Sequence, residues 1–232
     1  MDAKPTDAVR RIGKDSSMWM SIESCKNRKS DVVLSAGNTG ALMALSKLIL
    51  KTVDGIERPA ITALWPNTEG DSVVLDLGAN IDVSSNQLVQ FGIMGYSYAV
   101  CVLKKSHPKI AILNIGHEEF KGSNELQEAF ERLSVIFKDK FIGFVEGDDL
   151  SKGTADVIIT DGFTGNVALK TAEGIAKLIG FYLSDSLKSN ISGKLGMFIA
   201  QNSLKSFKKK IDPRGNNGGC LLYTSPSPRD FG

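Results

Sequence analysis

The stretch from Asp31 to Leu50 reads Asp-Val-Val-Leu-Ser-Ala-Gly-Asn-Thr-Gly-Ala-Leu-Met-Ala-Leu-Ser-Lys-Leu-Ile-Leu. Its apolar run Val32–Leu34 is typical of a buried parallel strand. Small residues follow over Ser35–Gly40, and leucine and isoleucine then recur at helical spacing. A strand, a tight loop and a helix would leave unpaired N–H groups and the positive end of a helix dipole facing an anion. The alternative is an ordinary turn, since the pattern is neither a dinucleotide fingerprint nor a Walker loop.

The composition of the 232-residue chain indicates a globular protein with one large α/β domain or two small ones. The net charge of +2 is nearly neutral, which argues against a general nucleic-acid partner. The three cysteines lie far apart, without disulfide or metal spacing, as expected in a reducing cytosol. We expect neither a signal peptide nor a membrane-spanning helix, because no apolar stretch is long enough to cross a bilayer.

The strand–loop–helix order recurs three more times along the chain. Alternating strands and helices indicate a mostly parallel sheet, in which the loops after the strand carboxyl ends share one edge and bind ligands there. Ser123 or Asn124 is expected to cap the third helix, and the fourth helix is expected from about Val167, after a loop over Asp161–Asn166. The expected strands, besides the opening one, are Ala60–Trp65, Ser72–Leu75, Lys109–Leu113, Phe141–Val145 and Asp156–Thr160.

Each of the four loops carries an asparagine, whose amide both donates and accepts hydrogen bonds. Four such loops favour a shared site, although turn chemistry alone also favours glycine and asparagine. The loops hold few nucleophiles, and His117 follows the more common pattern of a solvated loop residue. What remains is Lys121, Lys170 near a helix start, backbone N–H groups and several acids, an inventory that suits positioning and charge stabilisation. The four asparagines are Asn38, Asn80, Asn114 and Asn166, and the acids are Asp76, Glu118, Glu119 and Asp161.

Five segments of the chain together resemble the bacterial phosphate acyltransferase family of phospholipid synthesis, over residues from Asp2 to about Gly219. They are Lys-Asp-Ser-Ser-Met at 14–18, Ser-Ala-Gly-Asn-Thr-Gly-Ala at 35–41, Leu-Asp-Leu-Gly-Ala-Asn at 75–80, Asn-Ile-Gly at 114–116 with Glu-Glu-Phe-Lys-Gly at 118–122, and Asp-Gly-Phe-Thr-Gly-Asn-Val at 161–167. The resemblance implies acyl transfer from acyl-[acyl carrier protein] to inorganic phosphate, which yields acyl phosphate.

The resemblance also implies a three-layer α/β/α Rossmann-like fold, similar to that of phosphate acetyltransferases and isopropylmalate dehydrogenases, and a homodimer. It implies catalytic roles for Lys121 and Asn166, with no cofactor and no metal. We expect phosphate near Asn38, Thr39 and Lys121, and an oxyanion stabilised by Asn166 and loop amides. The full set of expected substrate-binding residues is Gly37, Asn38, Thr39, Gly40, Asp76, Gly78, Asn80, Asn114, Glu118, Asp161 and Gly165.

The chain departs from this family pattern at two positions and at both ends. Phe144 stands where many members have asparagine, and Asp148 stands where many have arginine. Met1 matches an internal point of the pattern, so we expect a partial catalytic domain over residues 1–219. Residues 220–230 match what a common transposase sequencing adapter encodes, which predicts a non-native tail over residues 220–232. A disordered Ser/Pro tail is the alternative, and the underlying nucleotides would decide between the two.

A helical hairpin is expected over residues 174–210. Its apolar stripe starts at Ile175, its tip carries Leu195, Phe198 and Ile199, and Phe207 is followed by three lysines. This pattern suits the interface of an anionic membrane, and equally the core of a hairpin or a dimer interface. The resemblance favours peripheral association with the inner face of the cell membrane, by an otherwise cytoplasmic protein.

Two other classes of function remain open. One is a CoA-dependent phosphate acetyltransferase or a metal-dependent dehydrogenase on a similar sheet. A dehydrogenase would hold magnesium through acids such as Asp76 and Asp161. The other class is a phosphate-sensing or membrane-docking module without enzymatic activity. A phosphate-dependent thioester assay separates these possibilities.

Overall fold

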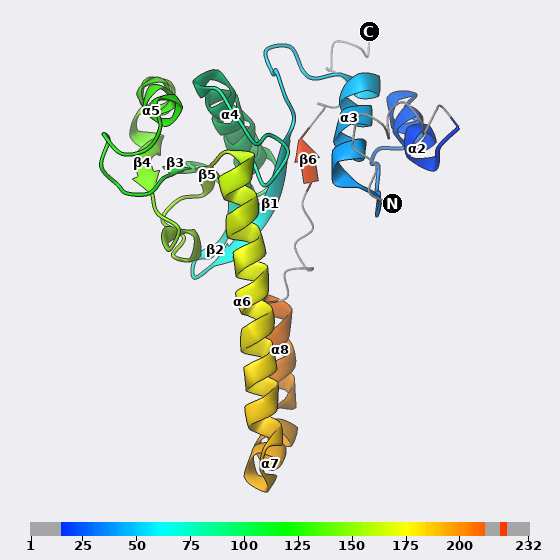
Figure 1. The fold of residues 1–232 in the computed structure, drawn as a ribbon, viewed down its shortest axis with the longest axis vertical. Helices are drawn as coiled ribbons and strands as arrows, with labels where there is room; N and C mark the ends of the chain where they lie inside the picture. The colour runs from blue at the N-terminus through cyan, green and yellow to red at the C-terminus, as the bar shows by residue number, and fades with distance from the viewer. Residues whose placement is uncertain (1–14, 212–218, 222–232) are drawn as a thin grey trace.

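The computed structural model describes residues 15–211 and 219–221, which include a six-stranded sheet (Figure 1). The order of the strands across the sheet is β4-β3-β5-β2-β1-β6. The four strands at one side of the sheet, β4, β3, β5 and β2, are mutually parallel. The strands are β1 (Ala60–Asn67), β2 (Gly70–Leu75), β3 (Ile110–Leu113), β4 (Phe141–Val145), β5 (Val157–Ile159) and β6 (Gly219–Leu221).

The first two strands form an antiparallel hairpin. Only Thr68 and Glu69 lie between them, and a connection this short cannot make the crossover that parallel strands need. Gly70 begins β2 at φ +135°, a conformation that side-chain-bearing residues rarely adopt. The α/β fold class with a mostly parallel sheet is confirmed, with an antiparallel strand added at one side.

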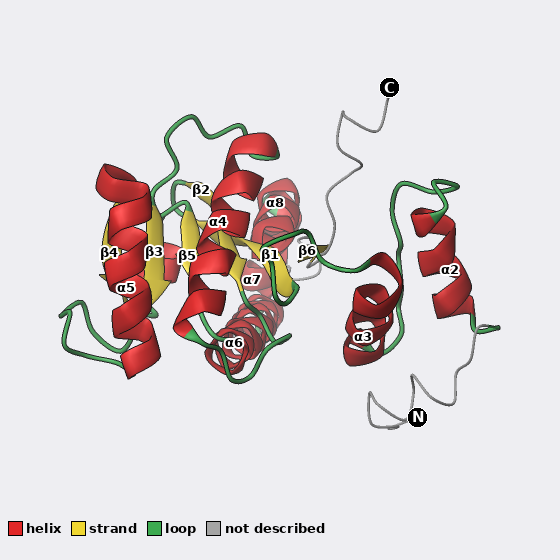
Figure 2. Ribbon diagram, turned by 90° about the horizontal axis from the view of Figure 1, so that it is seen from above, coloured by secondary structure: helices red, strands yellow, loops and turns green. Residues whose placement is uncertain are grey.

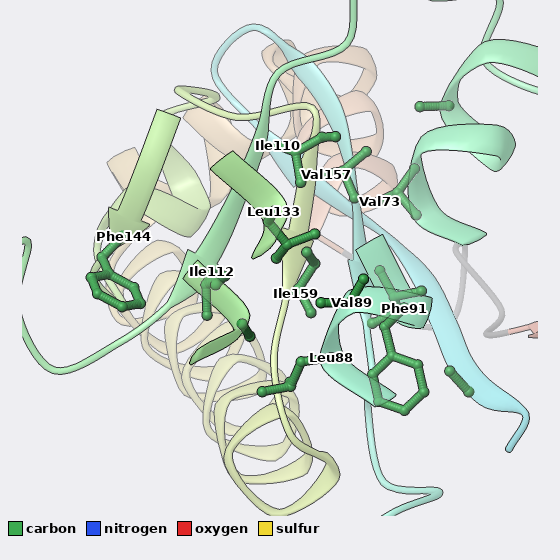
Figure 3. Packing of buried hydrophobic residues seen from close by; sticks show 14 residues of the cluster. Val73, Leu88, Val89, Phe91, Ile110, Ile112, Leu133, Phe144, Val157 and Ile159 are labelled. Atoms are coloured by element: carbon green, nitrogen blue, oxygen red, sulfur yellow. The ribbon is translucent and has the colours of Figure 1, made fainter. Parts of the chain in front are cut away.

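Helices α4 (Ser85–Cys101) and α5 (Asn124–Phe137) cover one face of the sheet (Figure 2). Alternate strand residues point to this face, so Val73, Ile112 and Ile159 pack with Phe91 and Leu133 of the helices (Figure 3). The intervening strand residues form a second cluster on the opposite face, where the first turns of α6 (Gly162–Lys188) pack. The period of two along each strand is therefore what separates the two layers of helices.

The N-terminal helices α2 (Ser17–Lys26) and α3 (Thr39–Leu50) pack mainly on each other, to one side of the sheet (Figure 2). The predicted helix α3 is confirmed, but the predicted strand Val32–Leu34 is wrong. Val32 is 77% exposed and Leu34 is 91% exposed, and neither belongs to a strand. A three-residue apolar run does not by itself supply a sheet edge to pair with, and in the described residues the outer edge of β1 is paired with β6.

The predicted loop at Asp161–Asn166 is also corrected, because α6 begins at Gly162. The Asp161 carboxylate caps the helix by accepting a hydrogen bond of 2.8 Å from the backbone N–H of Thr164. The two glycines of the segment suggested a loop, yet both lie inside the first helical turns. Their small size serves close packing, as described below.

The C-terminal half of α6 projects from the body of the molecule, and α8 lies beside it, with α7 at the tip (Figure 1). This is the predicted helical hairpin, and α7 and α8 span Ile191–Ile199 and Gln201–Ile211. A short 3-10 turn over Lys138–Lys140 precedes β4, and a second over Asp149–Ser151 follows it. Within the part of the chain that the structure describes, no helix is long and apolar enough to cross a membrane.

The predicted tail at residues 220–232 lies largely outside the described residues. Only its first two residues are described, as part of β6, which pairs with β1. Residues 1–14 also lie outside the described part. They include Met1 and Lys14, the first residue of the segment at 14–18 that carries the resemblance. The division at residue 219 stays a prediction.

Candidate functional site

The loop after β2 is organised around the carboxylate of Asp76, which is completely buried. Oδ1 accepts hydrogen bonds from the backbone N–H groups of Ile61, Gly78 and Ala79 at 2.9, 3.2 and 3.0 Å. Oδ2 accepts from the backbone and side-chain nitrogens of Asn80 at 2.7 and 2.8 Å. Five donors thus occupy this carboxylate, so Asp76 shapes the loop from within and does not offer its oxygens to a ligand.

The first turn of α6 packs directly against this loop. The backbone N–H of Gly162 donates to the carbonyl oxygen of Asn80 at 2.7 Å. A Cβ atom on Gly165 would lie 2.0 Å from the carbonyl oxygen of Asp76. Because that neighbour is backbone, it cannot move aside, and only glycine fits. The glycines of this segment therefore hold the helix and the loop in contact.

Asn166 lies in the second turn of α6, with an exposed side chain. A Cβ atom on Gly78 would lie 3.5 Å from Cγ of Asn166, so the amide sits against the loop after β2. Within residues 15–211 and 219–221 the Asn166 amide makes no hydrogen bond. It is therefore free to donate to an oxygen that arrives at this edge of the sheet.

Lys121 lies in the loop after β3, and its Nζ forms a salt bridge of 2.8 Å with Oε2 of Glu118. Their side chains are 38% and 48% exposed, so both can reach a ligand from solvent. The hydrogen bond from Lys121 lowers the pKa of Glu118, which keeps that carboxylate ionised. Asn114 fixes the loop from below, because its Nδ2 donates to the carbonyl oxygen of Lys121 at 3.0 Å. Lys121, Glu118 and Asn114 thus contact one another within this loop.

His117 ties the same loop to the turn after β4. Its Nδ1 lies 3.0 Å from the carbonyl oxygen of Phe144, and its Nε2 lies 3.6 Å from carboxylate oxygens of Glu146 and Asp149. The backbone hydrogen bond to Phe144 raises the pKa of His117, and these carboxylates with that of Asp148 raise it further. The sequence pattern of a solvated histidine missed this anchor, since its partners are over 25 residues away.

An acidic hollow of about 450 Å³ lies on one side of the loop after β2. Three carboxylate residues line it, Asp82, Glu125 and Asp161, and no lysine or arginine does. Hydrogen bonds from its own backbone N–H and from Ser123 lower the pKa of Glu125. This hollow therefore repels anions. The other lining residues are Ile81, Val83, Leu88, Ser123, Leu126 and Phe163.

A basic hollow of about 350 Å³ lies on the other side of the same loop, between it and α3. Lys47 and Arg58 line it, and no acidic residue does. Gly78–Asn80 face this hollow, and the next three residues along the chain face the acidic one. The remaining lining residues are Thr39, Gly40, Met43, Ala44, Pro59 and Ile61.

The residues predicted to bind substrate are therefore divided. Four of them line the basic hollow, Asp161 lines the acidic one, and Lys121 lines neither. Asn38 caps α3 by accepting a hydrogen bond of 3.0 Å from Ala41, and Gly37 packs near Met18. Neither Asn38 nor Lys121 lines the basic or the acidic hollow, so these two hollows do not bring them together. The four residues in the basic hollow are Thr39, Gly40, Gly78 and Asn80.

Sequence reasoning overlooked the two cations of the basic hollow. Lys47 resembles any lysine in the last turn of a helix, and Arg58 lies in a connecting turn. The available signal was an arginine directly before the proline and the strand of β1. Whether this arginine lines a hollow depends on the position of α3, which the spacing of residues in the sequence does not predict.

The sequence model of the family described as "fatty acid synthesis protein" matches residues 1–225. The chain belongs to this family. The phosphate acyltransferase of Rhodospirillum rubrum is 51% identical over 222 residues, and that of Parvibaculum lavamentivorans is 46% identical over 223. These matches cover 95% and 96% of this chain, and 63% and 62% of the two relatives. The chain thus spans less than two thirds of the length of these relatives.

Solved structures support the fold of this family member. The EutD phosphotransacetylase from Staphylococcus aureus matches with a TM-score of 0.54 and 18% identity, over 74% of this chain and 62% of its own. A phosphotransacetylase from Streptococcus pyogenes matches with a TM-score of 0.55 and 19% identity, over 68% and 54%. At this level of identity the likeness establishes a shared α/β architecture.

Proposed function

We propose that the chain carries catalytic machinery that transfers an acyl group from acyl-[acyl carrier protein] to inorganic phosphate. The observation that carries the proposal is the 46–51% identity to phosphate acyltransferases over nearly the whole chain. The geometry supports it, because Gly78, Lys121 and Asn166 follow β2, β3 and β5. These three strands are parallel neighbours, so their carboxyl ends lie at one edge of the sheet.

The reaction needs little covalent help from the protein. An oxygen of phosphate attacks the thioester carbonyl, the new C–O bond forms, and the C–S bond breaks. The sulfur leaves as a thiolate and takes up a proton, which gives acyl phosphate and the free thiol of the carrier. Because phosphate is already an anion, positioning and charge stabilisation carry the catalysis.

Two side chains have distinct roles in this proposal. The unpaired amide of Asn166 donates to the oxyanion that forms on the attacked carbon, a contribution of about 3 kcal/mol for a well-placed donor. Lys121 supplies positive charge at the same edge of the sheet. During the reaction its ammonium leaves the salt bridge with Glu118 and contacts the reacting group, which carries more negative charge. Asn114 holds the backbone of Lys121 and so fixes the start of this side chain.

The test is a phosphate-dependent assay of thioester loss with long-chain acyl-[acyl carrier protein], in the longest natural form of the protein. Lys121→Ala is expected to reduce acyl phosphate formation by about a thousandfold, since it removes the cation without touching the core. Lys170→Ala is the matched control, because Lys170 also forms an exposed salt bridge with a glutamate three residues away. Thioester loss that does not depend on phosphate, or an active Lys121→Ala variant, would contradict the proposal.

We further propose that the hairpin serves as a peripheral membrane contact and a dimer surface. The tip in α7 leaves Leu195, Phe198 and Ile199 between 60% and 78% exposed. The side of α6 also leaves Ile175 and Tyr182 more than half exposed. Apolar side chains at a projecting tip suit the acyl boundary of a bilayer, and those along the shaft suit a second copy of the chain.

Flotation with anionic vesicles tests the membrane contact. Phe198→Asp and Ile199→Asp are expected to lower the bound fraction severalfold, because a charge in the acyl boundary is costly. Val135→Asp is the control, since Val135 is 75% exposed on α5, far from the tip. Equal binding by all three variants would exclude the tip as the contact. Sedimentation of Tyr182→Asp tests the dimer surface, which predicts a shift to the monomer.

A further inference from the structure

We propose that the basic hollow is the subsite that holds the phosphate group of a substrate, through Arg58 and Lys47. The proposal rests on the proposed function for the identity of the ligand, and on the structure for its location. A phosphate group carries one or two negative charges and three or four acceptor oxygens. A planar guanidinium and an ammonium are the side chains that match such an acceptor best.

The two hollows differ in their charge balance. The basic hollow has two cationic residues and no acidic one along its wall, whereas the acidic hollow has three acidic residues and no cation. Both hollows are large enough for phosphate, and both border the loop after β2. The electrostatic preference for an anion therefore selects the hollow between this loop and α3.

Glu57, the acid next to Arg58 in the sequence, has other partners. The carboxylate of Glu57 is engaged by the side-chain amides of Asn86, Gln87 and Gln90 on α4. This network turns Glu57 away from its neighbour. In the part of the chain that the structure describes, the Arg58 guanidinium has neither a salt bridge nor a hydrogen bond. Arg58 thus lines the hollow with its charge unneutralised by these residues.

Lys47 also keeps its charge available to a ligand in the hollow. Its Nζ donates one hydrogen bond of 3.1 Å to the carbonyl oxygen of Glu57. This bond holds the ammonium near the start of β1 and leaves two of its three N–H groups for a ligand. A neutral carbonyl partner does not cancel the charge, so both cations of the hollow remain available to an anion.

The basic hollow and Asn166 share a neighbour in the loop after β2. Gly78 lines the hollow, and the Asn166 side chain packs against the same glycine. A phosphate in this hollow therefore lies on the same loop glycine as the proposed oxyanion donor. The loop amides of Gly78–Asn80 do not form an anion cradle, because all three donate to Asp76. Side chains must supply most of the binding.

Two sources could supply this phosphate group, inorganic phosphate or the phosphopantetheine arm of the acyl carrier. Isothermal titration with inorganic phosphate and with 4′-phosphopantetheine separates them. Arg58→Gln is expected to weaken binding of the true ligand by about tenfold or more, because a charged hydrogen bond is lost. Arg58→Lys restores charge without the planar fork and is expected to recover part of the affinity. Lys177→Gln is the matched control for Lys47→Gln, since Lys177 is exposed on α6, away from the hollow.

Weaker phosphate binding in Arg58→Gln and Lys47→Gln, with Lys177→Gln unchanged, supports a subsite for inorganic phosphate. Weaker binding of 4′-phosphopantetheine alone supports a subsite for the donor arm. Unchanged affinity for both ligands in Arg58→Gln overturns the proposal. A chain that binds phosphate through Arg58 and transfers no acyl group would contradict the proposed function and leave this subsite standing.

Discussion

Two hollows flank one loop, and they differ mainly in the sign of their charge. The acidic hollow lies where α5 and α6 begin, and the basic hollow lies where α3 meets the start of β1. Consecutive residues of the loop, 78–80 and 81–83, face opposite hollows. The loop thus forms a wall, one chain thick, between a hollow whose charges attract anions and a hollow whose charges repel them. The wall is rigid because the buried Asp76 carboxylate holds it from within.

The comparison also shows that a helix start is not by itself an anion site. The acidic hollow receives the N-terminal ends of two helices, which favour negative charge. Protein carboxylates already meet that preference, since Asp161 caps α6 and Glu125 lies in the first turn of α5. In the basic hollow, the cationic side chains add to the positive charge at the N-terminal end of α3. The charges of the surrounding side chains, more than the helix dipoles, therefore decide which of the two hollows favours an anion.

The largest expected effect comes from disrupting the contact between the start of α6 and the loop after β2. Gly165→Ala places a Cβ atom against the carbonyl oxygen of Asp76, so the helix or the loop must move. The free energy of unfolding is expected to fall by about 3 kcal/mol, the upper part of the range for overpacking. Chemical denaturation measures it. Gly174→Ala is the control on the same helix, where no atom lies within 4 Å, and it is expected to stabilise by about 0.5 kcal/mol. Equal effects would show that the contact is not tight.

A smaller effect is expected from the cap at the acidic hollow. Asp161→Ala removes the hydrogen bond to the backbone N–H of Thr164 and is expected to cost about 1 kcal/mol of stability. Asp161→Asn keeps a cap and removes the charge, so it is expected to retain most of the stability. Phosphate affinity is expected to stay within about twofold in both variants, because salt screens the charge of Asp161 over the distance to the basic hollow. A strong loss of affinity would move the phosphate site to the acidic hollow.

The smallest effect concerns pH and the His117 anchor. The pKa of His117 lies above its ordinary value of 6.5, because the Phe144 carbonyl and nearby carboxylates favour the charged form. The anchor therefore contributes stability that is fully present below pH 6.5 and is lost as the pH rises through the folded pKa. His117→Gln is expected to remove this dependence. Unfolding curves between about pH 5 and pH 9 measure it, and parallel curves for both proteins would contradict the anchor.

Much of the sheet could be predicted from the sequence. Short apolar runs such as those at 72–75 and 109–113 are bounded by polar loops, and the alternating helices imply their parallel arrangement. The run at Val32–Leu34 has the same local pattern and forms no strand. Strand formation needs a partner edge, and the sequence of one segment does not contain that information.

The site was less predictable because a residue type does not reveal its partners. Asn38 and Asn80 looked like ligand donors, yet Asn38 caps a helix and Asn80 donates to Pro59 and Asp76. Only Asn166 of the four loop asparagines has an exposed amide without a hydrogen bond in the described residues. The cations of the basic hollow lie outside the four loops that were predicted to bind a ligand, and only the position of α3 beside the start of β1 shows them together.

The most direct test measures the rate of acyl phosphate formation against phosphate concentration for Arg58→Gln and Glu125→Gln, one variant from each hollow. We expect Arg58→Gln to raise the KM for phosphate by about tenfold or more. We expect the KM of Glu125→Gln to stay near that of the parent protein. A KM that is unchanged in Arg58→Gln, or raised only in Glu125→Gln, would contradict the assignment of phosphate to the basic hollow.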